Sequence, residues 1–368
     1  MARISNVFTE RLGIDVPILG FAHDTQVAAA ITQAGGLGVY GIAHDEPSDL
    51  PAKLEALRTQ SGTAPTAVDM IIPAGMPENV TLDQVQASLP EEHKQFLDDI
   101  VRRYEVPPAT RKSFFNSTLR TPDYFEGQLD ALLDSDVAMV AFGVGLTKEA
   151  VEALKDAGKM VGALIGSPRH VERYLDIGLD FLVAQGSEAG GHTGTIGTLV
   201  LVPEVVELAG DLPVLAAGGI AHGSQIAAAL AMGAQGVWTG TIWLATREHA
   251  TGDHAVSEAL RAKLLAAGSG DTTVTRGSSG KPQRQINSMW AQEWNSAAAP
   301  PPLKMPYQHA LVGDVMTAVE EFEIDPLLYS AAGQSIGFVR EFLSVGEVMQ
   351  RLVDQTVAGL DRAKGYLK

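Results

Sequence analysis

Eight short apolar runs recur over the first 241 residues, and most are followed by a segment with helical periodicity. Continuous apolar runs of this length are typical of parallel strands buried on both faces. The alternation predicts a (β/α)8 TIM barrel, an α/β fold, with a doubly wound open sheet as the alternative. The runs are residues 16–20, 37–42, 66–72, 137–143, 159–166, 181–186, 212–219 and 236–241.

Two segments interrupt this alternation. Residues 73–122 place prolines and charged side chains between the third run and its expected helix. Barrels build lids and pockets from long loops at the carboxyl ends of strands, so we expect a lid-like insertion here. Residues 268–310 are rich in Gly, Ser, Ala and Pro, and two helix-like stretches follow. We expect a barrel over residues 1–267, insertion included, and a small helical portion over residues 268–368 packed back on it.

Composition excludes several classes of function. The formal net charge of −17 argues against nucleic acid or an anionic membrane as the main partner. The chain has no cysteine, which rules out disulfides and thiol nucleophiles, and its histidines lack the helical spacing of metal ligands, so we expect no metal. Neither a signal-type N-terminus nor a long apolar span is visible, which favours a cytoplasmic protein. A monomer and a homodimer both remain open.

A pair of glycine turns predicts an anion site. Gly218 and Gly219 lie between the seventh run and the next helix, and Gly240 with Thr241 ends the eighth run. Loops after strands 7 and 8 are the usual phosphate site of barrels, because free backbone N–H groups and the helix dipole favour an anion. The alternative is a pair of tight turns without a ligand.

The stretch AQGSEAGGHTG, residues 184–194, places a histidine in a glycine-rich turn after the sixth run. Gly190 and Gly191 would let the backbone approach a flat ring, and His192 has the pKa range to exchange a proton at its edge. The alternative is a histidine bonded into its own loop. Glu188 is interpreted as a loop-bonding acid in preference to a partner that orients His192.

These motifs together resemble the FMN-dependent nitronate monooxygenases, also called 2-nitropropane dioxygenases, and the related FMN-dependent enoyl reductases. The resemblance covers nearly the whole chain. It rests on AAAITQAGGLGVYG, AQGSEAGGHTG, LPVLAAGGIAHGSQIAAALAMGAQGVWTGT and SAAGQSIGFVRE. It implies a flavoprotein oxidoreductase with FMN at the carboxyl-terminal face of the barrel. FMN is favoured over FAD because one phosphate site and no adenosine-binding fingerprint are visible.

The resemblance also implies site residues. His192 matches the histidine that the family uses as a base or to orient the substrate. The positions similar to cofactor contacts are Gln185, Gly190, Gly191, Gly218, Gly219, Trp238, Thr239, Gly240, Thr241 and Gln334.

The chain departs from the family pattern at positions that the resemblance places near the flavin ring and the substrate. Residues 20–23 replace a Pro-Met-Ala-Gly-like segment, and Trp238 stands where Gln is common. Asp69 occupies the position of an asparagine that faces the flavin. An acid there would disfavour an anionic reduced flavin or would itself be held protonated.

Three functions follow as hypotheses. The first is a monooxygenase that oxidises alkyl nitronates with O2. The second is NAD(P)H-dependent reduction of an enoyl or other unsaturated thioester, with Phe114, Phe115, Tyr124 and Phe125 lining an acyl channel or simply packing in the insertion. The third is a barrel without catalysis that acts as a binding protein.

Overall fold

The computed structural model describes residues 2–73, 75–76, 80–113, 116, 119–252 and 254–367. Within them, eight parallel strands close into a barrel, because β1 pairs with both its neighbour β2 and the last strand β9. Each strand overlaps one of the apolar runs, so the TIM barrel is confirmed and the open sheet is wrong. The strands are β1 (Ile18–Ala22), β2 (Leu37–Gly41), β3 (Ala67–Ile71), β4 (Met139–Val144), β5 (Met160–Ile165), β6 (Phe181–Gln185), β8 (Val214–Ala217) and β9 (Gly236–Thr239).

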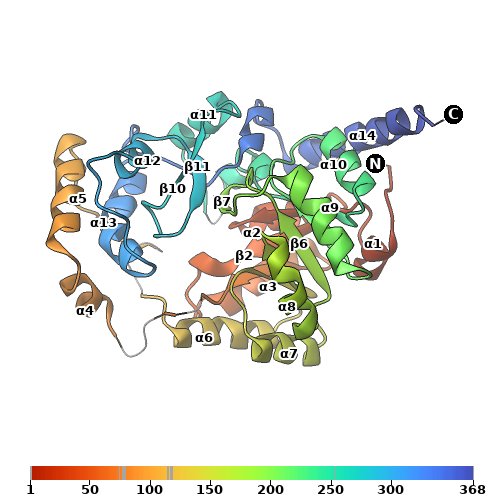
Figure 1. Cartoon of the computed structure of the whole chain (residues 1–368), viewed down its shortest axis with the longest axis horizontal. Helices are drawn as coiled ribbons and strands as arrows, with labels where there is room; N and C mark the ends of the chain where they lie inside the picture. Colours follow the sequence, from red (N-terminus) through yellow and green to blue (C-terminus); the bar gives the residue numbers. More distant parts are fainter. Residues whose placement is uncertain are drawn as a thin grey trace.

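Helices surround the barrel (Figure 1) and begin where polar side chains can cap them. Asp24 accepts the N–H groups of Gln26 and Val27 at the start of α2, and Thr147 accepts that of Ala150 in α7. The helices of the barrel are α1 (Val7–Leu12), α2 (Thr25–Gln33), α3 (Leu50–Ser61), α6 (Pro122–Leu133), α7 (Lys148–Asp156), α8 (Val171–Ile177), α9 (Thr198–Ala209), α10 (Gly223–Ala231) and α11 (Glu258–Ala266). Short 3₁₀ turns are η1 (Ile42–His44), η2 (Pro168–His170), η3 (Thr241–Trp243), η4 (Glu248–Ala250) and η5 (Gln334–Phe338).

Alternate strand residues fill the inside of the barrel. An apolar cluster there includes Leu37 and Val39 of β2, Ala67 of β3, Met139 and Ala141 of β4, and Phe181 and Val183 of β6. Side chains alternate along a strand, so the next inward residue toward the carboxyl end lies two positions further on. Those next residues are Gly41, Asp69, Gly143 and Gln185. They form the layer at the mouth of the barrel.

A second hydrophobic cluster lies beside the barrel. It joins the insertion helix α5 (Glu91–Arg103) to α12 (Met289–Trp294) and α13 (Tyr307–Glu321) through residues such as Ile100, Trp290 and Met316. A separate small cluster packs Val85 of α4 (Leu82–Ala87) against Ala310 of α13. We call residues 80–113 and 272–328 the cap lobe; Figure 1 shows its elements together on one side of the barrel. It also contains β10 (Thr272–Thr275) and β11 (Gln283–Ile286), which the sequence did not indicate.

The last helix, α14 (Val345–Lys364), follows the cap lobe in sequence and packs on the barrel helices α10 and α2. Gly223 at the start of α10 makes this contact possible, since a Cβ there would lie 2.3 Å from the backbone nitrogen of Thr356. The expected domain boundary at residues 267–268 stays a prediction. In the described part of the chain, no helix combines the length and hydrophobicity of a membrane span.

Candidate functional site

The loop after β6 is held from two sides. On the barrel side, the Gln185 side-chain amide donates to the carbonyl oxygen of His192 at 2.8 Å. On the side of the cap lobe, β7 (Gly191–His192) pairs with β11, where Gln283 lies opposite His192. Gln185 and His192, both singled out in the sequence, therefore belong to one hydrogen-bonded unit at the mouth of the barrel.

The imidazole of His192 contacts the cap lobe. Its Nε2 lies 2.9 Å from Oγ of Ser279, a buried residue of the β10–β11 connection. Burial, and secondly the charge of Lys281, lowers the pKa of His192 from 6.5 to about 4. The ring is therefore neutral near pH 7, and its hydrogen-bond partner lies outside its own loop.

The carboxylate of Glu188 stabilises the same loop without contacting His192. It accepts the backbone N–H of Thr198 at 2.9 Å and the Thr198 hydroxyl at 3.0 Å. Its backbone carbonyl accepts the N–H of Gln334 at 2.9 Å. Glu188 is thus a loop-bonding acid, and it brings Gln334 beside the loop across a long separation in sequence.

The two glycines of this loop differ in their surroundings. A Cβ at Gly190 would lie 2.8 Å from the backbone of Ala332 and Gly333, so the close approach there is to the chain's own backbone. Gly191 has a φ of +74° and no atom within 4 Å of such a Cβ. The N–H of Gly333 in turn donates to Oγ1 of Thr241 at 2.9 Å, which links this loop to the end of β9.

The glycine turns after β8 and β9 leave backbone donors free. Gly218 and Gly219 have φ values of +97° and +73°, a conformation that glycine adopts readily. Among the described residues, no acceptor receives the N–H groups of Gly219, Ile220, Gly240 or Thr241. By contrast, the Gln225 side chain accepts the N–H groups of Ala221 and His222 at the start of α10. The free N–H groups fit an anionic group such as a phosphate.

Trp238 and Thr239 of β9 use their side chains within the barrel. Trp238 is buried in the inner cluster and stacks on Phe21 with a centroid distance of 6.5 Å. The Thr239 hydroxyl donates to the carbonyl of Leu19 at 3.0 Å and accepts the indole N–H of Trp243 at 3.0 Å. Both side chains are already engaged in contacts within the protein, so the backbone of this segment would make any contact with a cofactor.

Asp69 points into the mouth of the barrel, where its Oδ2 atom is without a hydrogen bond from the described residues. The residue is 7% exposed. Burial raises its pKa well above the usual range for aspartate. A buried acid without a donor is unfavourable in its charged form, so burial favours the protonated form of this group.

Two stacked histidines, which the sequence analysis did not pick out as site residues, lie at the ends of β1 and β2. The rings of His23 and His44 are nearly parallel, with centroids 4.0 Å apart. Nδ1 of His23 lies 2.8 Å from the carbonyl of Gly41, and since a carbonyl only accepts, Nδ1 carries the proton. Burial lowers the pKa of His23 to about 4. The altered segment at residues 20–23 was the only signal of this pair.

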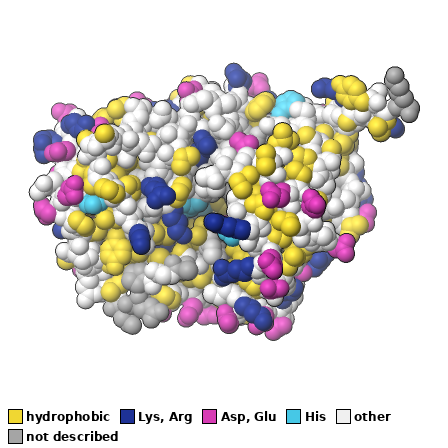
Figure 2. All heavy atoms as spheres, in the orientation of Figure 1, with side chains coloured by type: hydrophobic (Ala, Val, Ile, Leu, Met, Phe, Trp, Pro, Cys, Tyr) yellow, Lys and Arg dark blue, Asp and Glu magenta, His cyan; other side chains and the backbone are white. Residues whose placement is uncertain are grey.

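The cap lobe and insertion supply basic groups near this mouth. The guanidinium of Arg120 lies 5.8 Å from the ring centroid of Tyr124, and burial lowers its pKa to about 10. Figure 2 shows Lys and Arg side chains gathered around the middle of one face, where cap lobe and barrel meet. Tyr124 and Phe125 are buried, and the Tyr124 hydroxyl donates to the carbonyl of Asp45. Phe114 and Phe115 lie outside the described residues.

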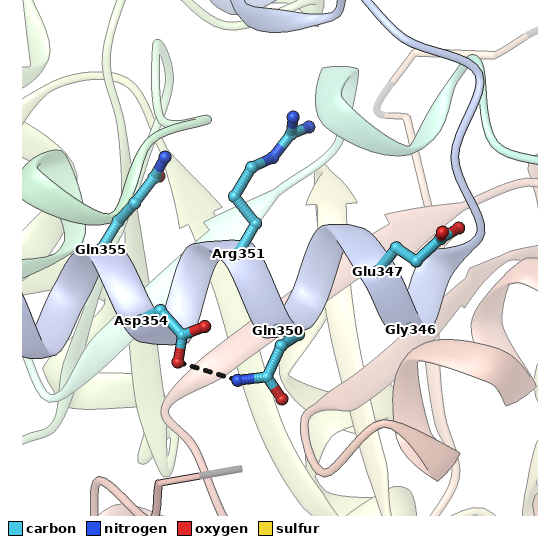
Figure 3. Close-up of a pocket in the computed structure, with 6 residues that line it drawn as sticks. All are labelled: Gly346, Glu347, Gln350, Arg351, Asp354 and Gln355. Carbon is cyan, nitrogen blue, oxygen red and sulfur yellow. Dashed lines mark hydrogen bonds between the residues drawn. The ribbon is translucent and has the colours of Figure 1, made fainter.

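Two hollows lie away from the centre of the mouth. One, of about 360 Å³, lies at the rim beyond β3 and β4, between Ile72, Gly145, Phe125 and Tyr174. The other, of about 490 Å³, is open and runs along α14 (Figure 3). Its polar side chains already bond: Gln350 donates to Asp354 at 2.8 Å, and Gln355 accepts from Gly223. Across the described residues, no cluster of three or more His, Cys, Asp or Glu is arranged to hold a metal ion.

Comparison with known proteins gives one consistent family. The family model described as nitronate monooxygenase matches residues 3–355. A putative monooxygenase of Mycobacterium tuberculosis is 38% identical over 363 residues, covering 96% of this chain and 92% of that protein. Among solved structures, nitroalkane oxidase from Streptomyces ansochromogenes has a TM-score of 0.77 and 26% identity, covering 97% and 100% of the two chains. FabK from Thermotoga maritima has a TM-score of 0.75 and 26% identity, covering 99% and 100%.

Proposed function

The chain belongs to the nitronate monooxygenase family and is an oxidoreductase, and from this premise we propose that it is an FMN-dependent enzyme that oxidises alkyl nitronates with O2. The observation that carries the proposal is the meeting of two features at one mouth. Free N–H groups at the turns after β8 and β9 suit a phosphate. The loop that holds Gln185 and His192 follows β6, the strand that pairs with β8, and so lies beside these turns.

The residues present suit FMN in the following way. The N–H groups of Gly219, Ile220, Gly240 and Thr241 would hold the phosphate. The inward layer and the loop after β6 would contact the ring through Asp69, Gln185, Gly190, Gly191 and Gln334. When bound, FMN supplies the electron-transfer chemistry, while the protein binds and orients the substrate.

His192 would orient the substrate and is poorly matched to deprotonating it. A group with a pKa of about 4 is a weak base near neutral pH and is unsuited to removing a proton from a neutral nitroalkane. A neutral imidazole still donates one hydrogen bond, and when Ser279 donates to Nε2 this donor is Nδ1. We therefore propose that the preformed anionic nitronate is the substrate and that His192 donates to one of its oxygens.

The charge around the mouth favours an anionic substrate. The whole chain carries a formal charge of −17, yet Arg120 and Lys281 lie near the histidines of the mouth and contribute to their pKa values. Local positive charge attracts small anions even when the net charge of the protein is negative. Arg120 and Lys281 would therefore attract the nitronate locally, against the acidic charge of the whole chain.

The test is an anaerobic titration of the FMN-loaded protein, followed by absorbance. Propyl-2-nitronate alone should remove the absorbance of oxidised flavin, and air should restore it with consumption of O2. His192→Asn should keep FMN and lose most of the turnover. A protein that takes up no FMN, or flavin reduced by NADPH but not by the nitronate, would contradict the proposal.

A second candidate is NAD(P)H-dependent reduction of an unsaturated thioester on the same scaffold. The likeness to FabK over 99% of this chain supports it. The same titration separates the two candidates, because only the reductase is reduced by NADPH alone. A colourless protein that takes up no FMN would instead support a binding protein without catalysis.

A further inference from the structure

We propose that Asp69 is the neutral hydrogen-bond donor that strand β3 offers to the flavin ring. This inference rests on the proposed function, because it requires FMN in the mouth of the barrel. It goes further in assigning a protonation state and a direction to the hydrogen bond. The donor is the hydroxyl of the carboxylic acid.

The position of the carboxyl group follows from the barrel. Asp69 pairs in register with Gly41 on β2 and with Ala141 on β4, and its side chain continues the inward row begun by Ala67. A Cβ on Gly143 would lie 2.9 Å from Oδ1 and 3.1 Å from Oδ2 of Asp69. The carboxyl group therefore lies over Gly143, at the mouth, flanked by residues with almost no side chain.

The described residues around Asp69 offer a carboxylate neither a hydrogen-bond donor to Oδ2 nor a nearby positive charge. Its Oδ2 atom is buried and receives no hydrogen bond from the described residues. Within the same residues, the shift in its pKa has burial as its one cause, so no Lys, Arg or His on β2, β4 or another element offsets the desolvation. An ionised carboxylate in such a place is strongly disfavoured by desolvation, whereas the acid form is neutral and carries one donor.

Among the described residues, no acceptor lies within hydrogen-bond distance of this Oδ2 atom. A flavin ring presents carbonyl oxygens and ring nitrogens that accept hydrogen bonds. A neutral donor at the ring favours added electron density, whereas a carboxylate at the same distance opposes it. The two protonation states of Asp69 therefore predict opposite effects on the reduction potential of the flavin.

The experiment measures the midpoint potential of bound FMN at pH 7 in the natural protein, Asp69→Asn and Asp69→Leu. Asparagine keeps a neutral donor, so its potential should equal that of the natural protein. Leucine removes the donor at similar volume, so its potential should fall. A clear rise in Asp69→Asn would show that a negative charge had been removed and would overturn the proposal. An unchanged potential in Asp69→Leu would overturn it too, since the side chain would then make no contact.

Infrared spectroscopy provides a second readout that needs no turnover. A band from a protonated carboxyl group, sensitive to H/D exchange, should be present in the natural protein and absent from Asp69→Asn. Its absence from the natural protein would overturn the proposal even if Asp69→Leu fails to fold. If none of the proteins takes up FMN, the proposed function itself fails; if all bind FMN but the potentials contradict the pattern, only the role of Asp69 fails.

Discussion

The side-chain amide of Gln185 donates a hydrogen bond of 2.8 Å to the backbone carbonyl of His192. Gln185 is the last residue of β6 and points into the mouth of the barrel, whereas His192 is paired with β11 of the cap lobe. The barrel and the cap lobe are thus connected through the residue proposed to orient the substrate. The position of the imidazole depends on both.

Removing this hydrogen bond should reduce turnover more than stability. Gln185→Leu leaves the carbonyl of His192 without this donor, and a net hydrogen bond of this kind contributes about 1 kcal/mol. A misplaced orienting group lowers the rate, so we expect a loss of roughly tenfold in kcat with propyl-2-nitronate, measured at saturating FMN because Gln185 is also proposed to contact the ring. Gln95→Leu, on the exposed face of α5, is the matched control. Equal kcat in the two variants would contradict a positioning role for Gln185.

The lowered pKa of His192 predicts two pH effects. Turnover of the nitronate should be level from pH 8 to about 5 and fall only as pH approaches 4, where the ring becomes protonated. In the unfolded chain the ring takes up its proton near pH 6.5, so the unfolded state binds more protons between pH 6.5 and 4. Stability is therefore lost as pH falls through this window, by up to about 1.36 kcal/mol per pH unit.

His192→Asn removes this contribution. Its free energy of unfolding, measured with urea, should decline less between pH 7 and pH 5 than that of the natural protein. The other buried histidines remain in both proteins, so the difference isolates His192. A parallel decline in the two proteins would contradict the lowered pKa.

A substitution in the left-handed turn after β8 should weaken FMN binding beyond its effect on the stability of the fold. In Gly219→Ala, a φ of +73° strains the new residue, and its Cβ lies 3.1 Å from that of Glu188. The strain costs about 1–2 kcal/mol, and the shift of the turn should weaken FMN binding by at least tenfold. Gly178→Ala is the control, since Gly178 has a φ of +80° at the end of α8 with open space around it. It should lose similar stability yet bind FMN normally; equal affinities would place the phosphate elsewhere.

The barrel could be predicted from the sequence because strands buried on both faces leave continuous apolar runs, and each of the eight runs overlaps a strand of the barrel. The two glycine turns were also visible, since Gly218 and Gly219 follow a strand directly and adopt positive φ values. Which ligand they bind stays a prediction until FMN binding is measured.

The rest depends on contacts between distant segments. The insertion helix α5 finds its partners only in α12 and α13, almost two hundred residues later, so periodicity could not reveal the cap lobe. The pairing of β7 with β11, and the stack of His23 on His44, likewise join segments that carry no shared pattern. The side chains of Trp238 and Thr239 pack toward β1, against Phe21 and the carbonyl of Leu19, a contact between distant segments that the sequence does not reveal. Their role in cofactor binding stays a prediction.

The raised pKa of Asp69 predicts that an acid in the mouth of the barrel destabilises the protein near neutral pH. The unfolded chain ionises this group near pH 3.9, whereas burial raises its pKa in the folded protein. Between the two pKa values the folded state binds the extra proton, so the stability of the protein falls as pH rises, by about 1.36 kcal/mol per pH unit.

The variant Asp69→Asn lacks this loss of stability. It should be more stable than the natural protein at pH 7 in urea denaturation without flavin, and the difference should vanish near pH 4. Asp314→Asn, exposed on α13, is the control. An Asp69→Asn variant no more stable than the natural protein at pH 7 would mean that the carboxyl group is ionised and solvated in the folded state, against its burial.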